Sequence, residues 1–142
     1  MAKIIFVNLP VEDVARAAAF YEAIGFTRNA MFSTPQAAAM EWSESISVML
    51  LDHGFYATFT DKRIIDPRTT SGALFALSFE SRADVDAITE AALAAGGREL
   101  HGPEDLGFMY SRAFEDPDGH GWGPMYMDMA AAATAMGQSQ HQ

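Results

Sequence analysis

The segment FEDPDGHGW, residues 114–122, gathers the side chains of this sequence that are best suited to acid–base chemistry. The imidazole of His120 could act as a general acid or base if a carboxylate such as that of Glu115 lies within hydrogen-bond reach. Between them, the tetrapeptide DPDG has the composition of a type I turn. The same pattern also fits a structural turn followed by a solvated histidine, so both interpretations of Glu115 and His120 stay open.

A second group of candidates has side chains suited to holding a small molecule. Arg112 stands in an otherwise apolar stretch, where a guanidinium either pairs with an acidic residue or anchors a ligand carboxylate. Asn8 shares a strand face with Phe6 and could orient a ligand, or it could satisfy the corner at Pro10. Aromatic and apolar side chains elsewhere would form the walls of the binding site, namely Met49, Leu51, Tyr110, Trp122 and Tyr126.

The composition limits the classes of partner. The chain has 142 residues and 49% apolar side chains, which suffices for one compact domain. Its net charge of −10 argues against nucleic acid and anionic membranes, and it favours a neutral or cationic ligand unless a local arginine overrides the net field. The absence of cysteine rules out disulfides and thiolate sites. The N-terminal segment is too short and polar for a signal peptide or membrane span, so we expect a cytoplasmic protein.

Two halves of the chain show the same order of expected elements. Residues 3–9 read as a strand, and a helix then opens at Glu12 and Asp13 and ends at Gly25. The helical pattern recurs 71 residues later, between Asp84 and Gly96. A strand over residues 73–79 precedes it. Three further strands follow each helix, over residues 26–33, 37–42 and 46–51 in the first half and 98–101, 109–115 and 122–128 in the second.

These elements predict an α+β fold made of two βαβββ modules, which pair edge to edge and curl a mixed sheet around a cleft. We assign residues 1–129 to a single domain, with module 1 at 1–52, a linker at 53–71 and module 2 at 72–129. The linker carries apolar side chains and could cover the mouth of a cavity. Residues 130–142 form an Ala- and Gln-rich tail, for which we expect a short helix and partial disorder.

Residues 6–26, 77–97 and 114–122 together resemble the glyoxalase, bleomycin resistance and extradiol dioxygenase superfamily, also called the vicinal oxygen chelate fold. The chain is most similar to its small members described as predicted lactoylglutathione lyases or glyoxalase-like proteins. The resemblance covers nearly the whole chain. It implies paired βαβββ modules around a cleft and assembly as a homodimer.

The resemblance also implies a divalent metal held by histidine or carboxylate side chains on four strands. Phenylalanine, leucine, methionine and glycine cannot bind such a hard cation. Such residues occupy the equivalent positions here, which are Phe6, a residue near Leu74, Met49 with Leu51, and Gly123. Gly123 follows Trp122 at the position where the family commonly has a glutamate. We therefore expect neither a metal nor another cofactor.

Three hypotheses about function follow. The first is a metal-free protein that binds a small apolar or aromatic molecule in its cleft and acts as a binding protein rather than an enzyme. The second is a metal-dependent glyoxalase-like lyase or dioxygenase whose displaced ligands involve Asp52, Glu115 or His120. The third is a non-catalytic structural or regulatory dimer, which would have a filled interior.

Overall fold

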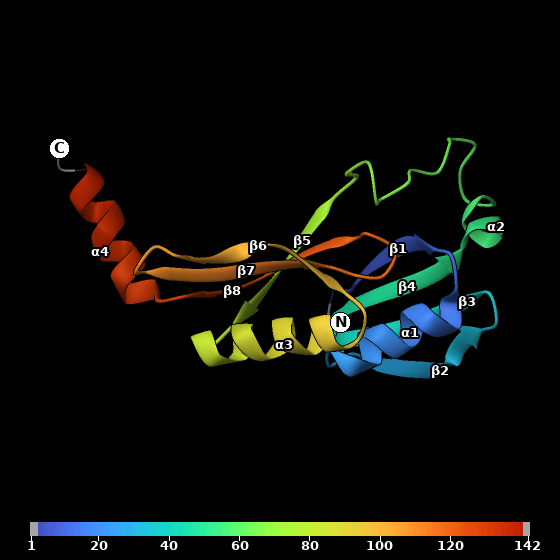
Figure 1. The fold of residues 1–142 in the computed structure, drawn as a ribbon, viewed down its shortest axis with the longest axis horizontal. Coiled ribbons are helices and arrows are strands. Elements are labelled where there is room, and N and C mark those ends of the chain that lie inside the picture. The colour runs from blue at the N-terminus through green and yellow to red at the C-terminus, as the bar shows by residue number, and fades with distance from the viewer. Residues whose placement is uncertain (1–2, 141–142) are drawn as a thin grey trace.

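The computed structural model describes residues 3–140 and contains the two expected βαβββ modules (Figure 1). The first consists of β1 (Ile5–Val11), α1 (Val14–Ala23), β2 (Thr27–Thr34), β3 (Ala37–Ser43) and β4 (Ile46–Asp52). The second consists of β5 (Leu74–Phe79), α3 (Arg82–Ala94), β6 (Arg98–Asp105), β7 (Met109–Glu115) and β8 (Gly121–Met127). A short helix α2 (His53–Tyr56) opens the linker, and α4 (Met129–Gln140) follows β8. Of the tail, residues 141–142 lie outside the described part.

Each module forms its own four-stranded mixed sheet, so the predicted α+β class is confirmed. The strand orders are β1-β4-β3-β2 and β5-β8-β7-β6, and the first strand of each module pairs parallel with its last strand. Within residues 3–140 no strand pairing joins the two sheets, which differs from the edge-to-edge pairing expected from the sequence. Pro10 lies inside β1 because this strand is a sheet edge, where a missing backbone donor is tolerated.

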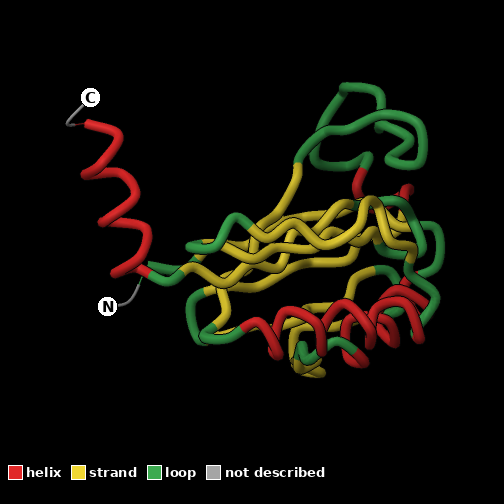
Figure 2. The backbone as a smooth tube through the Cα atoms, turned by 60° about the vertical axis from the view of Figure 1, so that its left-hand side comes forward, coloured by secondary structure: helices red, strands yellow, loops and turns green. Residues whose placement is uncertain are grey.

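The two helices α1 and α3 hold the modules together from one side. Both lie along the same side of the molecule, below most of the strands, while the linker rises above the opposite side at one end (Figure 2). Side-chain caps begin each helix, because Asp13 accepts the backbone N–H of Arg16 and Ser81 accepts that of Asp84. The cap at Ser81 starts α3 at Arg82, two residues before the position expected from the sequence.

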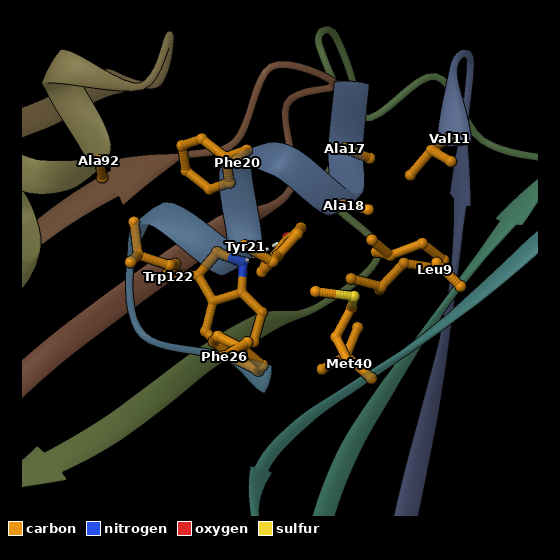
Figure 3. Packing of buried hydrophobic residues seen from close by; sticks show 14 of the residues in the cluster. Leu9, Val11, Ala17, Ala18, Phe20, Tyr21, Phe26, Met40, Ala92 and Trp122 are labelled. Atoms are coloured by element: carbon orange, nitrogen blue, oxygen red, sulfur yellow. Dashed lines mark hydrogen bonds between the residues drawn. The ribbon is translucent and has the colours of Figure 1, made fainter. Parts of the chain in front are cut away.

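The core is shared between the modules. Tyr21 of α1 packs against Trp122 of β8, with ring centroids 5.8 Å apart (Figure 3). Phe20 packs on Phe114 of β7, with ring centroids 6.3 Å apart. Contacts between aromatic rings add to the free energy gained by burying the rings. Aromatic packing through α1 therefore joins the two sheets in place of strand pairing.

Candidate functional site

The DPDG turn after β7 is organised around the carboxylate of Asp116. Its Oδ1 accepts the backbone N–H groups of Asp118, Gly119 and His120, each at 2.9 Å. Its Oδ2 accepts the hydroxyl of Tyr21 at 2.6 Å, and that hydroxyl in turn accepts the indole N–H of Trp122 at 3.0 Å. Burial raises the pKa of Asp116, while the charge of His120 and the bond from Tyr21 act in the opposite direction. This carboxylate thus fastens the turn to α1.

The two acid–base candidates, Glu115 and His120, are each bound to other partners. The Nε2 of His120 donates to the backbone carbonyl of Pro10 at 2.7 Å, so this ring nitrogen carries a proton. The carboxylate of Glu115 pairs with Arg98 at 2.9 Å. No hydrogen bond joins Glu115 and His120 in the described residues, so the arrangement lacks the contact that a histidine–carboxylate pair would need.

A pocket of about 750 Å³ lies between the end of β1 and the start of β5. This volume falls within the range of small-molecule sites. The linker forms one wall of the pocket, which agrees with the expectation that it covers a cavity mouth. The lining comes from residues 7–10 of β1, Tyr56, residues 60–75 except Asp61 and Asp66, Arg98, Leu100, Glu115 and residues 119–121.

The linker is held over this pocket by the DPDG turn. The guanidinium of Arg68 donates to Glu12 at 3.1 Å and to the carbonyl of Pro117 at 3.2 Å. Gly119 has a φ of +104°, and a Cβ there would lie 2.7 Å from backbone atoms of Pro67 and Arg68. Only glycine fits this conformation and this close approach without strain. Residues 114–122 therefore form the surface on which the linker packs.

Of the eight ligand-binding residues predicted from the sequence, Asn8 is the one that lines the pocket. Its side chain is exposed and makes no hydrogen bond within the described part of the chain. Phe6, two residues earlier, is 60% exposed outside the pocket. On β4, Met49 is half-buried and Leu51 is buried, and neither contributes to the pocket wall.

The other four predicted ligand-binding residues occupy the side of the second sheet that faces α3. Trp122 is buried in the shared core. The guanidinium of Arg112 binds Asp86, Glu90 and Glu99, which corresponds to the salt-bridge alternative left open by the sequence. Tyr110 donates to Asp86 at 2.6 Å, and Tyr126 lies under the guanidinium of Arg82. All four are thus engaged with the protein itself and lie outside the pocket lining.

Sequence reasoning missed the cations of the pocket wall. Lys62 and Arg63 both line the pocket from the linker. They are the only two adjacent basic residues in the chain, and they stand in a strongly acidic protein. This pair of basic residues in an acidic chain was the sequence signal that could have identified them as candidate binding residues.

A model of the Glyoxalase/Bleomycin resistance protein/Dioxygenase superfamily matches residues 3–123. The chain belongs to this superfamily. Solved structures agree on the fold. A hypothetical protein, SA1046, from S. aureus superposes with a TM-score of 0.75 at 21% identity, covering 89% of this chain and 94% of the other. A family enzyme from Burkholderia phytofirmans PsJN gives 0.73 at 19% identity, covering 89% and 99%. The fosfomycin resistance protein FosX from Mesorhizobium loti gives 0.67 at 14% identity, covering 94% and 98%.

No curated protein matches the chain by sequence. Among the described residues of this superfamily member, no helix combines the length and apolar character needed to cross a membrane.

The described residues of this superfamily member do not offer a set of ligands for a divalent metal. Residues 3–140 contain no group of three or more histidine, aspartate or glutamate side chains placed to share an ion. At Gly123, a Cβ would meet its nearest neighbours, the carbonyl oxygens of Arg112 and Phe75, at 3.8 and 3.9 Å. These are ordinary contacts, and the φ of Gly123 is not positive. Neither crowding nor backbone strain therefore explains the missing side chain at this position.

Proposed function

We propose that this protein binds a small apolar or aromatic molecule in the pocket between β1 and β5, without a metal. The observation that carries the proposal is a cavity of about 750 Å³ whose inner wall is largely apolar. The half-buried side chains of Val7 and Phe75 contribute to that wall, and the lining also includes Asn8, whose exposed amide makes no hydrogen bond in the described residues. A mainly apolar cavity with few polar groups is the usual form of a site for small molecules.

The alternative of a displaced metal site finds less support in the side chains it would need. The carboxylate of Asp52 caps α2 by accepting the backbone N–H of Phe55 at 2.8 Å. Glu115 is paired with Arg98, and His120 is bonded to the carbonyl of Pro10. A metal would have to break three existing interactions and bring these groups together. The third hypothesis, a purely structural dimer, predicts a filled interior and does not account for the pocket.

The proposal is tested by titrating the uncharged fluorescent dye N-phenylnaphthylamine into the protein. We expect saturable binding that an Asn8→Trp variant weakens by about tenfold, because the indole would occupy part of the pocket. Asn8→Ala is the matched control, since it changes the same strand position but leaves the cavity open. Both variants should have the same denaturation midpoint as the parent because Asn8 is exposed.

Two results would overturn the proposal. One is the absence of dye binding, and the other is equal binding by the parent and the Asn8→Trp variant. Elemental analysis of the untagged protein separates the metal-dependent alternative. Stoichiometric metal, together with a melting temperature that falls on chelation, would favour that alternative.

We also propose that the chain forms a homodimer through the start of β1. Ile4, Ile5 and Phe6 are 51%, 56% and 60% exposed, and β1 is an unpaired sheet edge. Consecutive exposed apolar side chains on an open edge strand favour association with another chain. Sedimentation should show a dimer that a Phe6→Lys variant dissociates. A parent protein that sediments as a monomer at high concentration would contradict this.

A further inference from the structure

The basic residues of this acidic chain are concentrated at one place. The sequence has nine lysines and arginines against 19 carboxylates, and four of those nine line the pocket, namely Lys62, Arg63, Arg68 and Arg98. Glu115 is the one carboxylate among the lining residues. The local field of the pocket is therefore opposite in sign to the net charge of −10.

Ion pairs within the chain do not neutralise all of this positive charge. Arg98 is neutralised by Glu115, and Arg68 is paired with Glu12. In the described part of the chain, neither Lys62 nor Arg63 lies within ion-pair distance of a carboxylate. The salt bridges found there involve Arg16, Arg68, Arg82, Arg98 and Arg112. Two uncompensated cations therefore remain on the linker wall.

Apolar side chains also line the pocket, so the cavity offers both charged and apolar surface. Phe75 and Val7 are half-buried in the lining, and Ile64 and Ile65 add apolar surface on the linker. A ligand that satisfies both kinds of surface needs an apolar body and an anionic head. A guanidinium binds a planar or tetrahedral anion through parallel hydrogen bonds, and an ammonium adds a point charge.

We propose that the pocket selects amphiphilic anions, in which a carboxylate, sulfonate or similar head is held by Lys62 and Arg63 and an apolar body lies against β1 and β5. This inference rests on the proposed function and narrows its ligand class. It also replaces the expectation of a neutral or cationic ligand drawn from the net charge, because the local cations outweigh the net field.

The test compares two dyes that differ by one sulfonate. Anilinonaphthalene sulfonate has the apolar body of N-phenylnaphthylamine with an anionic group added. We expect the native protein to bind the sulfonate more tightly, and the Lys62→Gln/Arg63→Gln variant to lose that preference, on the order of tenfold in its dissociation constant. Affinity for the uncharged dye should be unchanged in this variant. Added salt should weaken binding of the sulfonate only.

A Lys3→Gln/Arg28→Gln variant is the matched control. It removes the same two charges from exposed positions that do not line the pocket. It should bind both dyes like the parent protein. An equal loss of sulfonate binding in the control would overturn the inference, since the effect would then come from net charge.

The remaining outcomes separate this inference from the proposed function. Binding of both dyes with equal affinity would overturn the anion preference while leaving the apolar pocket in place. Binding of neither dye would overturn both proposals. Sulfonate binding that is as tight in the Asn8→Trp variant as in the parent would place the dye elsewhere and would also overturn the inference.

Discussion

The cations of this protein occupy two contrasting environments. On β7, the side chain of Arg112 is 9% exposed and is surrounded by Asp86, Glu90 and Glu99. On the linker, Lys62 and Arg63 are exposed at a pocket, with no ion pair found in residues 3–140. A cation inside the fold needs carboxylates to offset its desolvation, whereas a cation on a loop stays hydrated until a ligand arrives. Pairing within the chain therefore distinguishes a structural cation from one available for binding.

The pKa of Arg112 shows how complete its pairing is. Burial opposes its charge, but hydrogen bonds with Glu99, Glu90 and Asp86 outweigh that effect and raise the pKa of Arg112 above its ordinary value. The guanidinium therefore remains charged at any pH at which the protein folds, and its bonds join α3 to β6 and β7.

The largest expected effect is that of Arg112→Met. This change leaves three carboxylates close together without a counterion, and we expect the free energy of unfolding to fall by about 3 kcal/mol. The figure lies at the low end for a broken buried pair because Asp86 and Glu90 are 47% and 65% exposed and can be solvated. Urea denaturation at neutral pH measures it.

Arg63→Met is the matched control for this prediction. It makes the same substitution at an exposed, unpaired position, and we expect the unfolding free energy to change by less than about 0.5 kcal/mol. Equal losses in both variants would remove the distinction between the two environments.

The residues of the pocket show where prediction from sequence stops. Periodicity placed β7 at Met109–Glu115, the bounds observed, and glycine stops placed the ends of both helices. Alternation in an extended strand puts Tyr110 and Arg112 on one face of β7, and Trp122 and Tyr126 on one face of β8. It could not tell which face meets α3, because that depends on how α1 and α3 pack together. The ligand role predicted for these side chains would need a face open to the cleft, whereas the observed face meets α3.

The position of the linker could not be predicted from the sequence, for a different reason. Its position depends on contacts with residues distant in sequence, between Arg68 and Glu12 and between Pro67 and Gly119. No local propensity encodes such contacts, so the apolar side chains of the linker indicated that it could cover a cavity but not which of its residues face the cavity. The same limit hid the pocket role of Lys62 and Arg63.

A smaller effect is expected for Tyr21→Phe, which extends the comparison to uncharged polar groups inside the fold. The variant leaves the indole N–H of Trp122 and the Oδ2 of Asp116 without this partner in a buried site. We expect the free energy of unfolding to fall by about 1–2 kcal/mol. Tyr56→Phe, at a half-buried tyrosine of the pocket lining, should change it by less than about 0.5 kcal/mol. A Tyr21→Phe protein as stable as the parent would show that the bridge contributes nothing.

The smallest effect concerns Arg68, which lies between the two environments because one exposed carboxylate pairs with it. The hydrogen bond from Arg68 lowers the pKa of Glu12 from its ordinary value of 4.5. Because the pKa of Glu12 is lowered in the folded state, the pair of Glu12 and Arg68 stabilises the packed position of the linker at pH values above 4.5. This stabilisation is lost as the pH falls through the lowered pKa of Glu12. Affinity for the uncharged dye should therefore weaken over that acidic window, and less so in Glu12→Gln.

Glu22→Gln, at an exposed glutamate of α1, should keep the parental pH dependence. At neutral pH, Glu12→Gln also releases Arg68 from its partner, and we expect affinity for the sulfonate dye to rise by about twofold or less, as is usual for a single exposed charge pair. A fall in sulfonate affinity at neutral pH would show that Arg68 acts on the ligand through the position of the linker rather than through its charge. The ion pair of Arg68 with Glu12 would then have a structural role, like the ion pairs of Arg112. Lys62 and Arg63 alone would supply the positive charge that is available to a ligand in the pocket.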